Sequence, residues 1–163
     1  MKPYRFIIVF LFIANLTVAQ NDNLKPKLDE QISKWHQAAA DADLKTYRSL
    51  MTEDAIFIGT DPTEYWQGQD FINFAKPYFD RGKAWTFRKL ERHIYIDKSK
   101  QVAWFDELLD TQMGICQGSG VLVQVNGEWK IKHYVLSITI PNENVDKVKA
   151  LKAEFDKNLI EKY

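Results

Sequence analysis

An α+β fold with one domain is predicted by three observations. Apolar residues recur at helical spacing from Leu24 through the first half of the chain, and from Thr86 onward the sequence consists of β-rich segments separated by turn residues. Helices followed by a run of strands are typical of domains whose helices cover one face of a bent antiparallel sheet. The length of 163 residues fits one domain of this kind.

The first 19 residues have the pattern of a secretory signal. Lys2 and Arg5 form a basic start, residues 6–14 are an apolar run, and Thr17-Val18-Ala19 places small residues before a cut at Gln20. The alternative is a membrane anchor, but the apolar run is too short to span a bilayer of about 30 Å. We therefore expect an exported protein, periplasmic or secreted, with no stable membrane anchor.

Composition and charge exclude two further classes of protein, disordered chains and nucleic-acid-binding proteins. The chain is 45% hydrophobic and 13% aromatic, which is typical of a packed core and not of a disordered chain. Removing Lys2 and Arg5 with the signal leaves 20 of the 22 basic residues against 22 acidic ones. Nucleic-acid binding usually requires a basic face, so no nucleic-acid partner is expected.

Three helices are predicted in the first half of the mature chain. The first has a stripe of apolar residues at spacings of three and four, and Asp43 is placed to cap a short second helix. The third opens at Gly68, and Pro77 predicts a kink or restart near Lys76. The stripe of the first helix consists of Leu24, Leu28, Ile32, Trp35 and Ala39.

The strands are likewise predicted from their residue patterns and from the turn residues between them. Residues 55–58 predict a short strand that runs into the turn 59–62, and Asn126-Gly127 indicates a tight hairpin between the last two strands. The later strands are expected at 86–96, 102–113, 115–125 and 129–140. Residues 143–163 predict an added helix that docks on its own domain, pairs with another subunit, or is a frayed tail.

Metal and thiol chemistry have little support in the sequence. His36, His93 and His133 are far apart and no pair has ligand spacing, so neither a metal nor another cofactor is expected. Cys116 is the only cysteine, which indicates either a reactive or intermolecular thiol or, as we favour, a small buried residue on a strand.

Several segments resemble the SnoaL-like proteins of the nuclear transport factor two superfamily. Gly59-Thr60-Asp61-Pro62 with Trp66 and Gly68 resembles the link from the first strand to the third helix, and residues 102–105 resemble the central strand. The glycine-rich stretch 118–123 and the pattern from Gly127 to Ser137 resemble the last hairpin. The resemblance covers about residues 28–142 and implies a SnoaL-like domain over 20–142, followed by the C-terminal helix.

The resemblance implies a cone-shaped fold in which three helices pack on a strongly curved antiparallel sheet and leave an internal cavity. Dimers are common in this superfamily, so a homodimer is expected. The superfamily contains ketosteroid isomerase, scytalone dehydratase, transport factors and members without known activity. The catalytic residues of those enzymes do not match this sequence position by position, so none is carried over, and the fold alone does not decide the function.

The last strand supplies the first candidate site residues. His133 and Ser137 share one face with Trp129 and Ile131, because side chains alternate along a strand. The other face begins with Lys130 and Lys132, which are costly to bury, so the His133 face is predicted to be the interior. A histidine there can act as acid or base, or make only a structural hydrogen bond.

The remaining candidates are acids and aromatics. Asp106 and Glu107 are adjacent on one strand and point to opposite faces, so one of them is expected to face the cavity as a general base. Asp61 is either a carboxylate at the cavity mouth or the first residue of an Asx turn. Four aromatic residues are candidates for a ligand-binding wall or for the core: Trp35, Tyr47, Trp66 and Trp104.

These features favour a protein that binds a small apolar or amphipathic molecule in an internal pocket. Two alternatives remain open. One is a cofactor-free lyase, isomerase or hydrolase that uses His133 with Glu107, Asp106 or Asp61. The other is a dimeric interaction module that uses the C-terminal helix as its contact.

We predict that the mature protein begins at or near Gln20, because residues 1–19 are read as a cleaved signal. Mass spectrometry of protein isolated from its native cells should give a chain without those residues. Recovery of the uncut chain from the cytosol would contradict the prediction.

Overall fold

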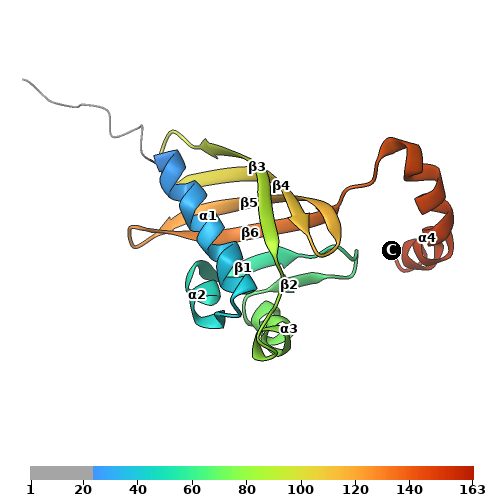
Figure 1. Ribbon diagram of the computed structural model, residues 1–163, viewed down its shortest axis with the longest axis horizontal. Helices are drawn as coiled ribbons and strands as arrows, with labels where there is room; N and C mark the ends of the chain where they lie inside the picture. The colour runs from blue at the N-terminus through green and yellow to red at the C-terminus, as the bar shows by residue number, and fades with distance from the viewer. Residues whose placement is uncertain (1–23) are drawn as a thin grey trace, which may run out of the picture.

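The computed structural model describes residues 24–163, so the predicted export signal lies outside the described residues. Figure 1 shows helices on one side of a curved sheet and the C-terminal helix standing beyond the end of the last strand. The domain is thus an α+β fold with its helices preceding most of its strands, as predicted. None of the helices in this part of the chain is long and apolar enough to cross a membrane.

The three covering helices follow the sequence pattern closely. Helix α1 spans Leu24–Ala40 and α2 spans Leu44–Ser49, where the Asp43 carboxylate accepts a hydrogen bond from the Thr46 backbone N–H at 2.9 Å. Helix α3 spans Gln69–Asp80 and continues through Pro77. The predicted restart near Lys76 does not occur, because a single helix runs through this position.

The sheet has six strands in the order β2-β1-β6-β5-β4-β3. The strands are β1 Met51–Ile58, β2 Tyr65–Gln67, β3 Phe87–Ile96, β4 Val102–Thr111, β5 Gly114–Val125 and β6 Glu128–Ile138. Strand β1 runs parallel to β6, whereas all other neighbours are antiparallel. The sheet is therefore mixed and not purely antiparallel as predicted, and the short strand β2 was not predicted.

A bulge interrupts the last strand. Val121 pairs with His133 but the next residue, Leu122, pairs with Ile131, so Lys132 is an extra residue in β6. An extra residue shifts the alternation by one position and exchanges the two faces of the strand beyond it. Ile131, Tyr134 and Leu136 are consequently the buried residues of β6.

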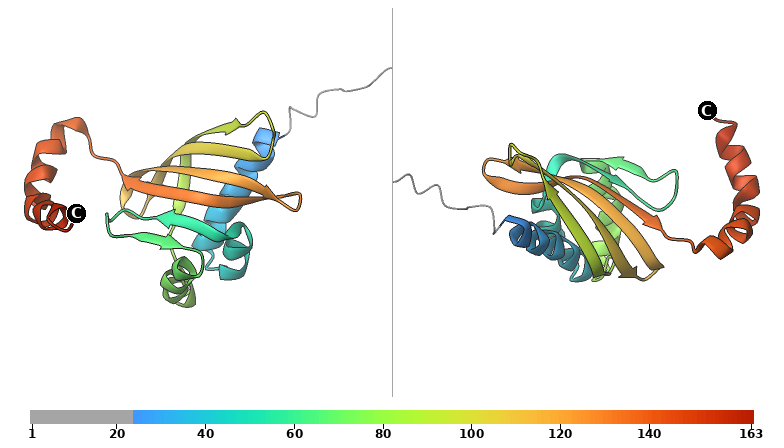
Figure 2. Two further views of the ribbon diagram at one scale, coloured as in Figure 1. Left: turned by 180° about the vertical axis from the view of Figure 1, so that it is seen from behind. Right: turned by 90° about the horizontal axis from the view of Figure 1, so that it is seen from above.

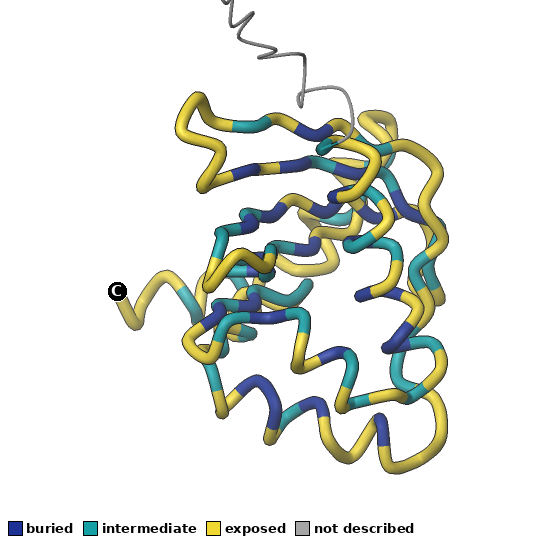
Figure 3. Tube along the Cα trace, turned by 90° about the vertical axis from the view of Figure 1, so that its left-hand side faces the viewer, coloured by how far each residue is buried: buried dark blue, intermediate teal, exposed yellow. Residues whose placement is uncertain are grey.

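The core lies between α1–α3 and one face of the sheet (Figures 2 and 3). Its largest fully buried side chains are aromatic: Trp35, Tyr47, Phe71, Phe105 and Tyr134 are each at most 2% exposed. Cys116 is also fully buried, which agrees with its expected role as a small strand residue. The opposite face of the sheet, called the outer face below, carries none of these three helices (Figure 2).

The chain ends in the 3₁₀ turn η1, Asn142–Asn144, and helix α4, Val145–Ile160. No residue of α4 is buried, and Leu151 is 87% exposed. Figure 1 shows α4 standing apart from the sheet, so in this structure it does not dock on its own domain.

Candidate functional site

A buried ionic cluster joins α1 to the inner face of the sheet. The Glu107 carboxylate lies at its centre, and its Oε1 atom is 2.8 Å from His36 Nε2 and accepts a hydrogen bond of 2.8 Å from the Tyr134 hydroxyl. Its Oε2 atom accepts a hydrogen bond of 2.8 Å from Arg92 Nε, and Arg92 Nη2 lies 2.7 Å away. The side chains of Glu107 and Arg92 are 0% and 1% exposed.

Strand register brings the sheet members of this cluster together. Arg92 on β3 is directly opposite Glu107 on β4, and opposite residues of neighbouring strands project from the same face. Gly118 on β5 is opposite Glu107 on its other side. A Cβ atom at Gly118 would lie 2.3 Å from the Tyr134 hydroxyl oxygen, so the missing side chain makes room for Tyr134 to reach Glu107.

The helix contributes the remaining contacts. Arg92 Nη1 donates to the backbone oxygen of Asp29 at 2.9 Å, to Asp29 Oδ1 at 3.0 Å and to Ser33 Oγ at 3.0 Å. Lys89 also pairs with Asp29 at 2.7 Å. These contacts, with His36 one turn further along, fix the position of α1 over β3 and β4.

The electrostatics keep the cluster charged. Burial by itself raises the pKa of Glu107, but the charge and hydrogen bond of His36, then Arg92 and Tyr134, outweigh it and lower that pKa to about 2. Burial, with the adjacent Glu107 charge, raises the pKa of Tyr134 well above its usual range, so this phenol remains a donor. Because an ionised carboxylate only accepts hydrogen bonds, His36 donates from Nε2.

This arrangement is suited to holding the fold together and poorly suited to proton transfer. A general base needs a pKa near the working pH, and the Glu107 carboxylate is far below it. The carboxylate is also enclosed on all sides, with no exposed side-chain surface. We therefore interpret the cluster as a structural ion network.

A small aromatic pocket lies beside this network. It has a volume of about 190 Å³ and is bounded by β1, β2, α3, the segment before β3 and the turn between β4 and β5. Seven aromatic rings line it: Phe57, Trp66, Phe71, Phe74, Tyr78, Trp85 and Phe87. Its polar groups are few and come from Thr60, Glu64 and Gln112.

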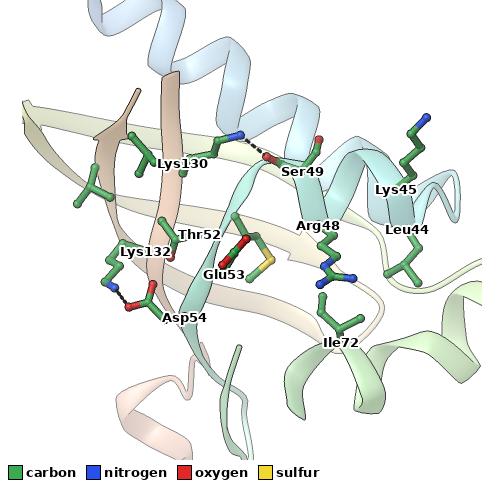
Figure 4. Close-up of a pocket in the computed structure, with 13 residues that line it drawn as sticks. Leu44, Lys45, Arg48, Ser49, Thr52, Glu53, Asp54, Ile72, Lys130 and Lys132 are labelled. Atoms are coloured by element: carbon green, nitrogen blue, oxygen red, sulfur yellow. Dashed lines mark hydrogen bonds and ion pairs between the residues drawn. The ribbon is translucent and has the colours of Figure 1, made fainter. Parts of the chain in front are cut away.

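A second, larger hollow lies elsewhere on the domain, between α2, the start of β1 and the hairpin of β5 and β6. We call it the basic groove; its volume is about 870 Å³ (Figure 4). Four basic side chains and two acidic ones line it above an apolar floor. The basic residues are Lys45, Arg48, Lys130 and Lys132, and the acids are Glu53 and Asp54.

The structure does not place His133 and Ser137 in the interior. Beyond the bulge at Lys132 the inner positions of β6 pass to Tyr134 and Leu136, so His133 and Ser137 lie on the outer face. The prediction that they face the cavity is therefore wrong. It assumed an unbroken alternation from Trp129 to Ser137, which one inserted residue invalidates.

The paired acids on β4 separate as alternation predicts. Glu107 faces inward, whereas Asp106 lies on the outer face, where its Oδ1 atom is 2.8 Å from His93 Nδ1. Asp61 occupies an exposed turn, where its carboxylate accepts hydrogen bonds from the Thr63 backbone N–H at 2.8 Å and hydroxyl at 2.5 Å. Asp61 thus caps an Asx turn, and the predicted catalytic set of His133, Glu107 and Asp61 is not brought together.

The four aromatic candidates divide among three environments. Trp35 and Tyr47 are fully buried in the core and stack on one another with ring centroids 5.0 Å apart. Trp66 lines the aromatic pocket. Trp104 lies on the outer face, 45% exposed, and stacks on Tyr95 at 5.8 Å.

Sequence reasoning missed three members of the ionic network: His36, Arg92 and Tyr134. Arg92 could have been found, because it alternates in step with Ile94 and faces Glu107 once β3 and β4 are paired about their turn. His36 lies next to Trp35 on the apolar stripe, which hides it among core residues. Tyr134 could not be found, because it faces inward only through the bulge.

Metal binding has no structural support among residues 24–163. No group of three or more histidine, cysteine, aspartate or glutamate side chains there is arranged to hold an ion.

Comparisons with known proteins agree on the architecture. A family model described as a SnoaL-like domain matches residues 29–141. An NTF2-like protein of unknown function from Pseudomonas putida superposes with a TM-score of 0.62 at 12% identity, over 73% of this chain and 89% of that one. An NTF2-like protein from Cytophaga hutchinsonii gives a TM-score of 0.59 at 15% identity, over 72% and 99% of the two chains.

A third similar structure is an association domain. The association domain of CaMKII from C. elegans gives a TM-score of 0.58 at 19% identity, over 70% of this chain and 95% of that one. At these identities the likeness shows the fold alone. None of the curated proteins compared with the chain matches it.

We predict that Glu107→Gln lowers the free energy of unfolding by about 3–5 kcal/mol at pH 7, since it leaves the buried Arg92 charge without its main partner. The folded-state pKa of about 2 lies below the usual 4.5. The stabilisation by the ionised Glu107 is therefore present above about pH 4.5 and is lost as the pH falls toward 2. The loss in the free energy of unfolding is about 3 kcal/mol. Urea unfolding at a series of pH values measures both effects.

Asp106→Asn is the matched control, because this neighbouring carboxylate is exposed on the outer face. Its stability at pH 7 should lie within about 0.5 kcal/mol of the wild type. The free energy of unfolding of Glu107→Gln should also change less than that of the wild type as the pH falls from 4.5 toward 2. Equal stability of the two variants would refute the structural role of the network.

Proposed function

The chain belongs to the SnoaL-like domain family, and from the geometry of its aromatic pocket we propose that it binds a small, flat, largely apolar molecule there. The observation that carries this proposal is the lining of the pocket: seven aromatic rings surround a volume of about 190 Å³. A dry cavity of about 150 Å³ is known to accept a single benzene ring. The pocket therefore has the size of a one-ring or small two-ring ligand.

The rings are already arranged as a rigid wall. Phe57 and Phe71 stack with centroids 4.3 Å apart, and Trp66 stacks on Phe74 at 3.9 Å. Stacked pairs keep their rotamers fixed, so little side-chain entropy is lost when a ligand enters. Preorganised apolar walls with a few polar groups are characteristic of small-molecule sites.

The polar groups limit the orientation of the ligand. Glu64 is the carboxylate of the pocket, and its Oε2 atom accepts a hydrogen bond of 3.2 Å from the Asp61 backbone N–H. A ligand that carries a hydroxyl or N–H at one end can donate to this carboxylate while its ring contacts Trp66 and Phe74. Phenol and indole have this combination, and we choose them as probes.

Binding can be followed through the fluorescence of Trp66 and Trp85, which both line the pocket. Phenol and indole analogues without their own emission should quench or shift this fluorescence in a saturable way. Met113→Trp is expected to block the pocket, because Met113 lines it from the turn between β4 and β5 and is 37% exposed, so the larger side chain does not disturb the core.

The control is Leu90→Trp, which adds the same side chain at an exposed position of β3 outside the pocket. Saturable binding of the probes, measured by calorimetry, should be lost in Met113→Trp and retained in Leu90→Trp. No saturable binding to the wild type by any single-ring probe would remove the proposal.

The outer face of the sheet supports a second proposal, which is that the protein forms a homodimer through it. No helix from α1 to α3 covers this face (Figure 2), and Trp104 and Tyr95 stand on it at 45% and 43% exposure. Exposed aromatic residues grouped in this way are typical of association surfaces. The similarity in fold to an association domain agrees with this proposal.

Trp104→Glu should weaken the dimer by at least about 30-fold, because it removes a central aromatic contact and adds a charge. Light scattering at tens of micromolar should then report one chain, against two for the wild type. Leu151→Glu on α4, 87% exposed, should leave the dimer intact. A monomeric wild type, or a dimeric Trp104→Glu variant, would contradict the proposal.

A further inference from the structure

The basic groove is separate from the aromatic pocket, and it begins where the sheet is broken. Met51 pairs with Ile131 and Ile56 pairs with His133, so four residues of β1 stand against the single bulge residue Lys132 of β6. The two strands part between these pairs. Bulges of this kind often re-aim side chains beside binding sites, and here residues 52–54 and Lys132 all line the groove.

The floor of the groove is apolar. Val123 lies on the outer side of β5, because its neighbour Leu122 is fully buried in the core. Val125 continues this row and is 39% exposed. Leu44 from α2, Met51 from β1 and Ile72 from α3 complete the floor. Five aliphatic or thioether side chains from four elements thus line one open surface.

The rim of the groove carries an excess of positive charge, with four basic residues against two acids, although the whole chain has no net charge. Two of the lysines are engaged. Lys132 pairs with Asp54, and Lys130 donates to the Ser49 backbone oxygen at 2.7 Å and pairs with Glu128 at 2.9 Å.

Arg48 differs from these lysines. Among residues 24–163 its guanidinium takes part in none of the ion pairs or side-chain hydrogen bonds, and Figure 4 shows it projecting from α2 across the groove toward Ile72. It also lines an adjoining hollow of about 350 Å³ that extends the groove past Gly68 and Gln69. A guanidinium with free donors is suited to a carboxylate, which it can bind with two parallel hydrogen bonds.

From these observations we infer that the basic groove binds a free alkyl carboxylate, with its head group on Arg48 and its chain along the apolar floor. The volume of about 870 Å³ lies within the usual range for ligand sites, about 300–1,000 Å³. An uncharged ligand would leave Arg48 unpaired, and a small inorganic anion would leave the floor exposed. An anion with an apolar chain satisfies both.

The test is titration of the full mature chain with decanoate below its micelle concentration, followed by calorimetry and by NMR of the methyl groups. Saturable binding should shift the methyl signals of Leu44, Met51 and Val123, which line the groove. Shifts confined to residues of the aromatic pocket, such as Leu136, would assign decanoate to that pocket and overturn the inference.

Arg48→Gln should weaken decanoate binding by roughly 10-fold to 100-fold, the loss expected for a charged hydrogen bond of about 1.5–3 kcal/mol. Its thermal stability should equal that of the wild type, because Arg48 is exposed. Lys98→Gln, in the exposed turn between β3 and β4, removes the same charge away from the groove and should bind decanoate as the wild type does. Equal losses of decanoate affinity in both variants would show that only the net charge of the protein matters, and would refute the site.

Two further ligands distinguish the source of the affinity. Decanol has the chain without the charge, so it should bind more weakly than decanoate and be indifferent to Arg48→Gln. Vesicles of phosphatidylglycerol present an anionic surface without a free carboxylate chain, and they should not co-sediment the protein. Co-sedimentation that is lost in Arg48→Gln would replace the free carboxylate by a lipid surface and overturn the inference as stated.

Discussion

The ion pair between Glu107 and Arg92 is the contact on which the rest of the domain depends. Both side chains are at most 1% exposed, so each charge is without water and must be satisfied by the protein. That requirement brings His36 and Asp29 from α1, and Tyr134 from β6, to the same point. The network thereby joins the first helix to β3, β4 and β6. Within the network both oxygens of the Glu107 carboxylate are engaged by His36, Tyr134 and Arg92.

The bulge at Lys132 decides which side chains can serve this network. It turns Tyr134 toward Glu107 and His133 toward the outer face. The same irregularity parts β1 from β6 and opens the basic groove between them. One inserted residue therefore completes the interior network, places His133 and Ser137 on the outer face and opens a charged hollow between β1 and β6.

The resulting surfaces differ in their chemistry. The aromatic pocket is small and nearly neutral, with Glu64 as its charged group, which favours a flat ligand that donates a hydrogen bond. The basic groove is wider and carries Arg48, which has no ion pair within the described part of the chain, over aliphatic side chains, which favours an anion with a chain. The outer face presents Trp104 and Tyr95 stacked together and favours another protein surface. The three surfaces have different central residues, so substitution of Met113, Arg48 or Trp104 alters one surface without removing the others.

The sequence by itself determined the class of fold and the order of its elements. The spacing from Leu28 to Ala39, the Asp43 cap and the Asn126-Gly127 turn are local signals, and local signals act whatever the rest of the chain does. It also put Asp106 and Glu107 on opposite faces of their strand. Only the tertiary structure decided that Glu107 is the inward acid, that Tyr134 replaces His133 in the interior, and that Arg48 has no ion pair among residues 24–163. These outcomes depend on a one-residue bulge and on contacts between distant strands, and the energy of such contacts exists only after the chain has folded.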